Sequence, residues 1–361
     1  MENQSKQQMY TKLQTHVKDL PWFVEEYVNY KKRKLSVASL LNYVHDYKIF
    51  FHWLVTENDY PGDLKELPLE LLESMTVQEA EQFLTFLQYE LQNKEVTINR
   101  KLSGLKSLFN YLQNIAETRD LQPYLKRNVM AKLEFNDIKE SMETTANKME
   151  GNILIGDEYE EFRQFVASEY GKLVTDNKKL VNFHLRNRER DTAVVSLILG
   201  SGLRLSEVVN LNVDDIDHSK YTARVIRKGN KEQFVYFSKQ AKADLDDYLQ
   251  IRAQRYKIKQ TNKALFVAAA MGPKGTPRRL TARSIEKLVE KYSTAFGKPS
   301  LSVHKLRHSF ATRYHNEIND VPKLRRQLGH SSIQTTMIYT HIHNDDLKNA
   351  VDRMDLPKDD E

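Results

Sequence analysis

Along the first third of the chain, apolar residues recur at intervals of three and four, the spacing of an amphipathic helix. The strongest run covers residues 40–54, and Ser36 precedes it as an N-cap residue. Another run follows Thr76 and Glu79, whose separation is that of a capping box. The pattern therefore predicts a compact bundle of about four helices over residues 1–118.

The apolar pattern weakens between residues 119 and 152, where Glu, Lys, Asn and Thr dominate. A polar stretch of this kind predicts a linker with little helix of its own. From residue 153 the apolar pattern returns, and it includes a nearly all-apolar helix after Asp191 that should be buried. We therefore predict a helical domain over 1–118, a polar linker over 119–152 and a second domain over 153–361.

Strand-like alternation is confined to the second domain. Two short runs, 221–226 and 232–237, alternate with period two and flank a turn at Gly229 and Asn230. This pattern predicts a β-hairpin, so the expected fold class is mainly α with a small β-hairpin or sheet in the C-terminal domain. Residues 347–354 place apolar side chains on one face of a short final helix, which should dock on a protein surface.

The composition limits the classes of protein. The chain of 361 residues has no cysteine, which excludes disulfides, a thiolate zinc site and a cysteine nucleophile. Its net charge of +6 favours a polyanionic partner, with a basic protein that binds no polyanion as the alternative. The N-terminus is polar, and no apolar run approaches the roughly 18 residues of a membrane span. We therefore expect a cytoplasmic protein without a membrane contact.

Basic residues stand at positions where a phosphate backbone could be contacted, although a solvated charged face is the alternative for each. Two groups follow from their places in the predicted elements, the helical bundle and the second domain. The candidates in the bundle are Lys31, Lys32, Arg33, Lys34, Arg100, Lys101 and Lys106, and those in the second domain are Arg227, Lys231, Arg283 and Lys287.

Candidate chemistry is concentrated near the C-terminus. His304 and Arg307 are three residues apart and share one helix face, and His330 and Tyr339 follow within a further 32 residues. Arginine and protonated histidine donate to phosphate oxygens that gain charge in a transition state. A tyrosine hydroxyl is a possible nucleophile that needs help to lose its proton. The set therefore suits attack of Tyr339 on a phosphodiester, whereas a lone His-x-x-Arg is more often part of a core helix.

One further arginine stands next to a buried segment. The run GSGLRLSE places Arg204 after the apolar helix and Glu207 one turn later. An arginine beside a hydrophobic core needs partners for a permanent charge and five donors. Arg204 is therefore a candidate for phosphate binding, with a structural Arg–Glu pair as the alternative.

These motifs carry a family resemblance. Two motifs resemble the C-terminal signature of the tyrosine recombinases, and their residues are close to those of the Xer branch: HKLRHSFAT at 304–312 and LGHSSIQTTMIYTHI at 328–342. The polar segments are longer than in the compact Xer pattern, which favours a resemblance to the XerS type, a Xer recombinase that works without a second paralogue. The resemblance implies catalytic roles for Arg204, Lys228, His304, Arg307, His330 and Tyr339, with Glu207 in support, and it implies no metal and no cofactor.

The resemblance also implies how the protein is used. It implies a site-specific recombinase that cuts and rejoins DNA through a 3′-phosphotyrosyl intermediate and resolves chromosome dimers at a terminus site. The helical domain would be a core-binding domain that forms a C-shaped clamp on DNA together with the catalytic domain, and the final helix would pack into a neighbouring protomer. The implied partners are a double-stranded inverted-repeat site, a homo-tetramer on two such sites and an FtsK-type DNA translocase.

Three alternatives remain open at this point. A phage or transposon integrase belongs to the same family, a type IB topoisomerase uses a similar residue set, and a non-catalytic DNA-binding protein could share the fold. The residues do not encode the DNA sequence recognised, the order of strand exchange or the need for an accessory protein.

Overall fold

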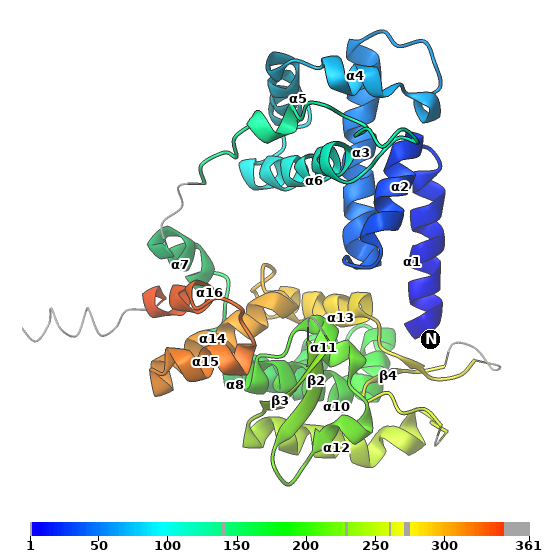
Figure 1. Cartoon of the computed structure of the whole chain (residues 1–361). Coiled ribbons are helices and arrows are strands. Elements are labelled where there is room, and N and C mark those ends of the chain that lie inside the picture. Colours follow the sequence, from blue (N-terminus) through cyan, green and yellow to red (C-terminus); the bar gives the residue numbers. More distant parts are fainter. Residues whose placement is uncertain (1, 139–141, 228–229, 260, 271–274, 343–361) are drawn as a thin grey trace, which may run out of the picture. The chain divides into compact units, whose positions relative to one another are not determined.

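Two compact units, Met1–Lys139 and Glu140–Glu361, make up the structure (Figure 1). Both are mainly helical, and only the second contains strands among the described residues. The structure is a computed structural model that describes residues 2–138, 142–227, 230–259, 261–270 and 275–342.

The first unit is a helical bundle, as the apolar spacing predicts. The helices are α1 (Glu2–Val17), α2 (Trp22–Lys31), α3 (Val37–Glu57), α4 (Leu69–Ser74), α5 (Val77–Tyr89) and α6 (Glu95–Asn114), with short 3-10 turns η1 (Leu64–Glu66) and η2 (Met130–Lys132).

Local capping confirms two of the predicted helix starts. The Ser36 hydroxyl accepts a hydrogen bond from the backbone N–H of Ser39 at 3.1 Å, so α3 begins where the N-cap pattern placed it. Thr76 and Glu79 form the reciprocal capping box at the start of α5. Between them, α3 and α5 bring apolar faces to a common core.

Aromatic rings fill the core of the first unit. Phe50 on α3 meets Phe83 on α5 and Phe109 on α6 edge to face, with ring centroids 5.1 Å and 6.1 Å apart. Such pairs stabilise a core by about 1 kcal/mol beyond their buried area. Tyr47 adds a buried hydrogen bond between α3 and α6, in which its hydroxyl donates to the Gly104 carbonyl at 2.9 Å.

The prediction that residues 119–152 form a separate polar linker is wrong, because parts of this segment belong to each of the two units. Leu125, Met130 and Leu133 are buried in the core of the first unit. Ala146, on α7 (Met142–Glu150), is instead buried in the second unit. Around Leu125 and Leu133 the chain is non-helical apart from the short turn η2, so their spacing has no helical period and pattern analysis could not detect their burial.

The second unit contains the remaining elements. They are α8 (Glu158–Gln164), the π-helical turn η3 (Phe165–Glu169), α9 (Tyr170–Leu173), α10 (Lys178–Ser201), α11 (Leu205–Asn210), η4 (Val213–Asp215), β1 (Ile216–Asp217), β2 (Thr222–Arg227), β3 (Lys231–Tyr236), α12 (Lys239–Arg255), β4 (Val267–Ala268), β5 (Arg278–Arg279), α13 (Ala282–Ala295), α14 (Val303–Ile318), α15 (Val321–Leu328), α16 (Gln334–Met337) and η5 (Ile338–His341).

The long helix α10 forms the centre of the second unit. It begins at Lys178, well before Asp191, because the Asn177 side chain caps it by accepting from the N–H groups of Lys179 and Leu180. Its first half is largely polar and its second half is buried, as predicted for the segment after Asp191. The helix ends at Gly202, whose positive φ of 69° allows the chain to turn toward Arg204.

The predicted hairpin is confirmed. Strands β1, β2 and β3 form an antiparallel sheet in that order, and Arg227 pairs with Lys231 next to the turn. Asn230 has a φ of 59°, a left-handed conformation that asparagine tolerates better than most residues. A second small sheet pairs β4 with β5. The hairpin carries Arg227 back toward the end of α15.

Candidate functional site

The C-terminal end of α15 gathers three guanidinium groups. The last carbonyl groups of a helix lack intrahelical partners and carry the negative end of its dipole. Three consecutive carbonyls here each accept a hydrogen bond from an arginine of a different segment, and the arginines thereby converge on one point. The pairs are Arg227 with Gln327 at 3.1 Å, Arg307 with Leu328 at 2.8 Å and Arg204 with Gly329 at 3.0 Å.

Gly329 is required at this point of convergence. Its φ of 64° is in the left-handed region, where a residue with a side chain is strained. A Cβ atom at Gly329 would also overlap the guanidinium of Arg227. The glycine therefore lets the arginines approach the backbone.

Glu207 holds two of the three arginines. Its Oε1 accepts from Arg204 Nη1 and from Arg227 Nε, both at 3.0 Å. Its Oε2 accepts from the backbone N–H of Arg204 at 2.9 Å, and the side chain is only 4% exposed. The structural Arg–Glu pair considered from the sequence is thus present and serves to orient Arg204.

Arg227 was predicted as a phosphate contact, and its surroundings contradict that prediction. Its side chain is 10% exposed. Its donors reach Glu207, the Gln233 side chain and the Gln327 carbonyl. A buried guanidinium with these partners supports the site from within the protein.

Arg307, from α14, is the most deeply buried of the three. Its Nη1 donates to the Gly202 carbonyl at 2.5 Å, and the residue is 2% exposed. Burial, with a smaller contribution from the charge of Arg204, lowers the pKa of Arg307 to about 10. The group therefore remains charged at neutral pH.

His330 is neutral in this arrangement, although the sequence analysis expected a protonated donor. Arg307 Nη2 lies 3.0 Å from His330 Nε2. Because arginine only donates, this nitrogen must accept, so the proton is on Nδ1 and is donated to Thr336 Oγ1 at 3.0 Å. Burial and the neighbouring arginines lower the pKa of His330 to about 4.

Tyr339 lies beside this group on the turn η5. The residue is 1% exposed and packs in an apolar cluster with Phe310 and Leu328. Its hydroxyl is 2.7 Å from Nδ1 of His308. Burial raises the pKa of Tyr339 to about 12, against the opposing charges of Arg307 and Arg204. The phenol is therefore protonated at neutral pH.

His308 was missed by the sequence analysis. His304, for which the resemblance implies a catalytic role, meets the ring of His308 edge-on with centroids 4.3 Å apart. The available signal was the position of His308, directly after Arg307 and four residues after His304 on one helix. The prediction for Lys228 lies outside the described residues.

The candidate DNA contacts in the bundle differ in how far their side chains are exposed and paired. Lys101 is buried, and its Nζ pairs with Asp46 at 3.0 Å, so its assignment as a surface contact is wrong. Arg100 also pairs with Asp46, and Lys106 donates to the Leu133 carbonyl at 2.5 Å. Arg33 and Lys34 are exposed.

The lysines at the end of α2 are half-buried against aromatic rings. Lys31 Nζ lies 5.6 Å from the Tyr27 ring centroid, and Lys32 Nζ lies 5.0 Å from that of Tyr10. Lys32 also donates to the Tyr10 hydroxyl at 3.1 Å. In the second unit, the exposed candidates are Lys231, Arg283 and Lys287.

A shallow cleft of about 490 Å³ opens next to His330. The strand β3 lines it with Lys231 and Gln233, and α15 lines it with Arg325 and Arg326. The cleft thus offers basic side chains beside the point where the arginines converge.

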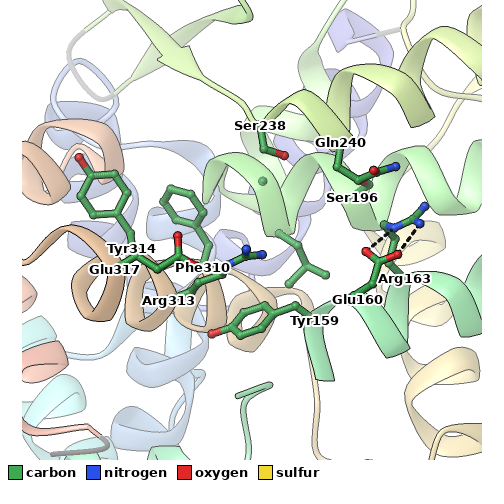
Figure 2. A pocket seen from close by; sticks show the side chains of 12 residues that line it. Tyr159, Glu160, Arg163, Ser196, Ser238, Gln240, Phe310, Arg313, Tyr314 and Glu317 are labelled. Carbon is green, nitrogen blue, oxygen red and sulfur yellow. Dashed lines mark hydrogen bonds and ion pairs between the residues drawn. The ribbon is translucent and has the colours of Figure 1, made fainter. Parts of the chain in front are cut away.

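A more enclosed pocket of about 250 Å³ lies elsewhere in the second unit (Figure 2). Its lining includes Tyr159, Glu160, Arg163 and Arg313, and Arg163 is paired there with Glu160. None of the described residues predicted to be catalytic lines this pocket, so it is separate from the candidate site.

Two further properties concern the described part of the chain. Its histidine and carboxylate side chains form no group of three suited to holding a metal ion. None of its helices combines the length and the apolar character needed to cross a membrane.

Comparison with known proteins gives a consistent result. Residues 174–345 match the model of the phage integrase family. The chain is 39% identical over 346 residues to Tyrosine recombinase XerS of Streptococcus gordonii, covering 93% of this chain and 96% of that protein. It is 37% identical over 358 residues to the protein of the same name from Streptococcus uberis, covering 95% and 98%.

Solved structures share the fold. XerH site-specific recombinase bound to difH substrate superposes with a TM-score of 0.61 at 21% identity, covering 88% of this chain and 80% of that one. A lambda integrase dimer bound to a COC′ core site gives a TM-score of 0.58 at 16% identity, covering 88% and 93%. The comparisons agree with the resemblance found in the C-terminal motifs.

Proposed function

The chain belongs to the tyrosine recombinases of the phage integrase family, and from this membership we propose that it cuts and rejoins DNA at a specific site through a covalent bond to Tyr339. The observation that carries the proposal is the convergence of Arg204, Arg307 and His330 at the end of α15. Fixed cations at one point suit a phosphate whose charge grows during the reaction.

The two arginines have donors to spare for a phosphate. Among the contacts of the described residues, Arg204 uses two of its five N–H groups and Arg307 uses three. The remaining donors would bind the non-bridging oxygens, and each such donor is typically worth about 3 kcal/mol in the transition state.

His330 would also donate to the phosphate once DNA is bound. An anion next to a neutral imidazole favours its charged form and raises its pKa. The phosphate would compete with His330 for the Arg307 donor, and His330 Nε2 would then take up a proton and donate to a phosphate oxygen.

The reaction proposed is a transesterification. The phenol oxygen of Tyr339 attacks phosphorus as the bond to the 5′ oxygen breaks, which leaves a 3′-phosphotyrosyl bond and a free 5′-hydroxyl. Lys228 is proposed as the general acid on the leaving oxygen, and His304 as the group that receives the phenol proton. Attack by a 5′-hydroxyl of a second duplex reverses the step and exchanges strands. The bond energy is conserved, so neither ATP nor a metal ion is required.

The substrate and cellular role are inferred from the resemblance to the Xer recombinases. We infer that the substrate is a double-stranded inverted-repeat site, bound by both units as a clamp and paired in a homo-tetramer. The exposed residues Arg33, Lys34, Arg283 and Lys287 are proposed phosphate contacts. The proposed task is resolution of chromosome dimers in the cytoplasm at a terminus site, with an FtsK-type translocase as activator.

A nicked substrate tests the chemistry. A nick beside the scissile phosphate lets the cut strand diffuse away and traps the covalent adduct. Tyr339→Phe should abolish the adduct and leave DNA binding intact, whereas Tyr314→Phe, a tyrosine of α14 with no proposed role, should keep it. An adduct that persists in Tyr339→Phe contradicts the nucleophile assignment. Relaxation of supercoiled DNA without a paired site would favour a topoisomerase instead.

A further inference from the structure

The only hydrogen bond of the Tyr339 hydroxyl within the described residues is to His308, a residue with no role in the mechanism above. The 2.7 Å distance joins the phenol oxygen to Nδ1, and the two ring centroids are 5.7 Å apart. We propose that His308 is a positioning residue whose Nδ1 accepts the phenol hydrogen and fixes the Tyr339 oxygen next to Arg307. The inference rests on the proposed function, in which Tyr339 is the nucleophile.

The direction of the hydrogen bond follows from the protonation states. Burial raises the pKa of Tyr339 to about 12 and lowers that of His308 to about 3. At neutral pH the phenol therefore has a proton to donate and the imidazole has a lone pair to accept it. With the lone pair on Nδ1, the proton of His308 must be on Nε2.

Charged and titratable neighbours keep His308 neutral. His304, Arg307 and Lys305 act from the same helix α14, and His330 acts from the end of α15. All four lower the pKa of His308, in addition to burial. Tyr339, on η5, is the neighbour that donates to it. No described neighbour of His308 in this set is an anion that would stabilise an imidazolium.

The same values indicate that His308 holds the phenol and does not deprotonate it. Because burial raises the pKa of Tyr339 and lowers that of His308, proton transfer from the phenol to this imidazole is strongly unfavourable in the DNA-free state. We keep His304 as the proposed proton acceptor, and its ring lies edge-on to that of His308.

Positioning matters because Tyr339 lies on a short turn and its buried ring has a hydroxyl that needs a partner. The turn η5 has four residues, and the apolar contacts of the Tyr339 ring do not fix the direction of its hydroxyl. A nucleophile displaced by about 1 Å from its line of attack can lose about 10²-fold in rate. The hydrogen bond to His308 supplies the missing directional constraint.

Two substitutions at one position test the inference. His308→Leu removes the acceptor, whereas His308→Asn places an amide oxygen close to the position of Nδ1. In single-turnover formation of the covalent adduct on a nicked site, we expect His308→Leu to be about 100-fold slower and His308→Asn to recover most of that loss. DNA affinity should be unchanged in both. His218→Leu, on the turn after β1, is the matched control and should react at the wild-type rate.

A sulfur-substituted substrate separates positioning from proton donation. With sulfur in place of the bridging 5′ oxygen, the leaving group departs without a general acid. This substrate should restore Lys228→Ala and leave the His308→Leu defect in place. The defect should also be constant between pH 6 and 9, because His308 does not titrate in that range.

Each outcome decides the question. Wild-type rate in His308→Leu, or rescue of its defect by the sulfur substrate, overturns the inference. If His308→Leu does not fold, His308→Asn must react at least about tenfold faster than His308→Gln, whose acceptor lies one bond further out, and equal rates overturn the inference. A covalent adduct in Tyr339→Phe would instead refute the proposed function itself, so the two failures are distinguishable.

Discussion

The two units bury different kinds of side chain. The core of the first unit is built from aromatic and aliphatic residues, such as Phe50 and Phe109, and its buried charged cluster is centred on Asp46. The second unit buries or half-buries several charged groups, among them Arg190 with Asp191 and the arginines at the end of α15. Burying charge costs stability unless partners compensate it. In the second unit, this cost arises where the proposed chemistry needs fixed cations.

The histidines show the same contrast. In the described part of the second unit, the pKa values of His184, His304, His308 and His330 are all lowered, with burial as the largest cause. In the first unit, a lowered pKa is found at His45. Because more histidines with a lowered pKa lie in the second unit, we expect its stability to depend more strongly on pH than that of the first.

The largest expected effect comes from removing the carboxylate that holds two arginines. Glu207→Ala would leave Arg204 and Arg227 without their shared anion, at a cost of about 4 kcal/mol to the second unit. Asp46→Ala in the first unit leaves the buried Lys101 without its anion, while Arg100 is 47% exposed and can be solvated. It should cost less, because removal of Glu207 also leaves Arg204 and Arg227 uncompensated close to the charge of Arg307. Hydrogen exchange resolved by segment measures both. Equal destabilisation of the two units would contradict the comparison.

Acidification should destabilise the second unit more than the first. In the unfolded chain a histidine binds its proton near pH 6.5, whereas folded His308 and His330 bind theirs near pH 3 and 4. The unfolded chain therefore holds more protons as the pH falls below 6.5, and the stability of the folded unit decreases until about pH 3, where His308 also binds its proton. From pH 7 to 5 we expect a loss of about 4 kcal/mol from the two histidines together, which unit-resolved hydrogen exchange at the two pH values measures.

That pH dependence has an internal control. A variant with His308→Asn and His330→Asn carries no imidazole at either position, so its loss of stability over the same pH range should be smaller. An unchanged loss would assign the acid sensitivity to other groups.

A smaller effect is expected where the backbone meets the arginines. Gly329→Ala strains a positive φ and overlaps the Arg227 guanidinium, so we expect a loss of about 2 kcal/mol in the second unit. Gly151→Ala is the matched control, because nothing lies within 4 Å of the added Cβ. Thermal unfolding compares the two, and a neutral Gly329→Ala would show that Arg227 can move aside.

The smallest effect concerns the surface of the first unit and changes binding, not stability. Replacing Arg33 and Lys34 together with Gln should reduce the dependence of log K on log salt by up to about two, because each lost phosphate contact removes roughly 0.9 from the slope. Lys65→Gln also removes an exposed charge and should leave the slope unchanged. An unaltered slope in the double variant would place the DNA contacts elsewhere.

Particular residues show where prediction from sequence ended. The capping residues Ser36 and Thr76 and the hairpin turn were found because capping and turns depend on neighbours within a few residues. The burial of Leu125 and Lys101 was not found, because it depends on packing against other segments of the bundle; Lys101, for example, pairs with Asp46, 55 residues away in the chain. The same holds for Arg227, whose partners Glu207 and Gln327 are 20 and 100 residues distant.

The sequence by itself determined the helical character, the bundle of the first unit, the family and the residues that carry the proposed chemistry. Those properties depend on local spacing and on motifs, which a linear chain displays directly. Only the tertiary structure decided that three arginines meet at one helix end, that His330 is neutral there and that the Tyr339 hydroxyl is hydrogen-bonded to His308. Hydrogen bonding and desolvation act between groups that are close in space, and only folding determines which groups those are.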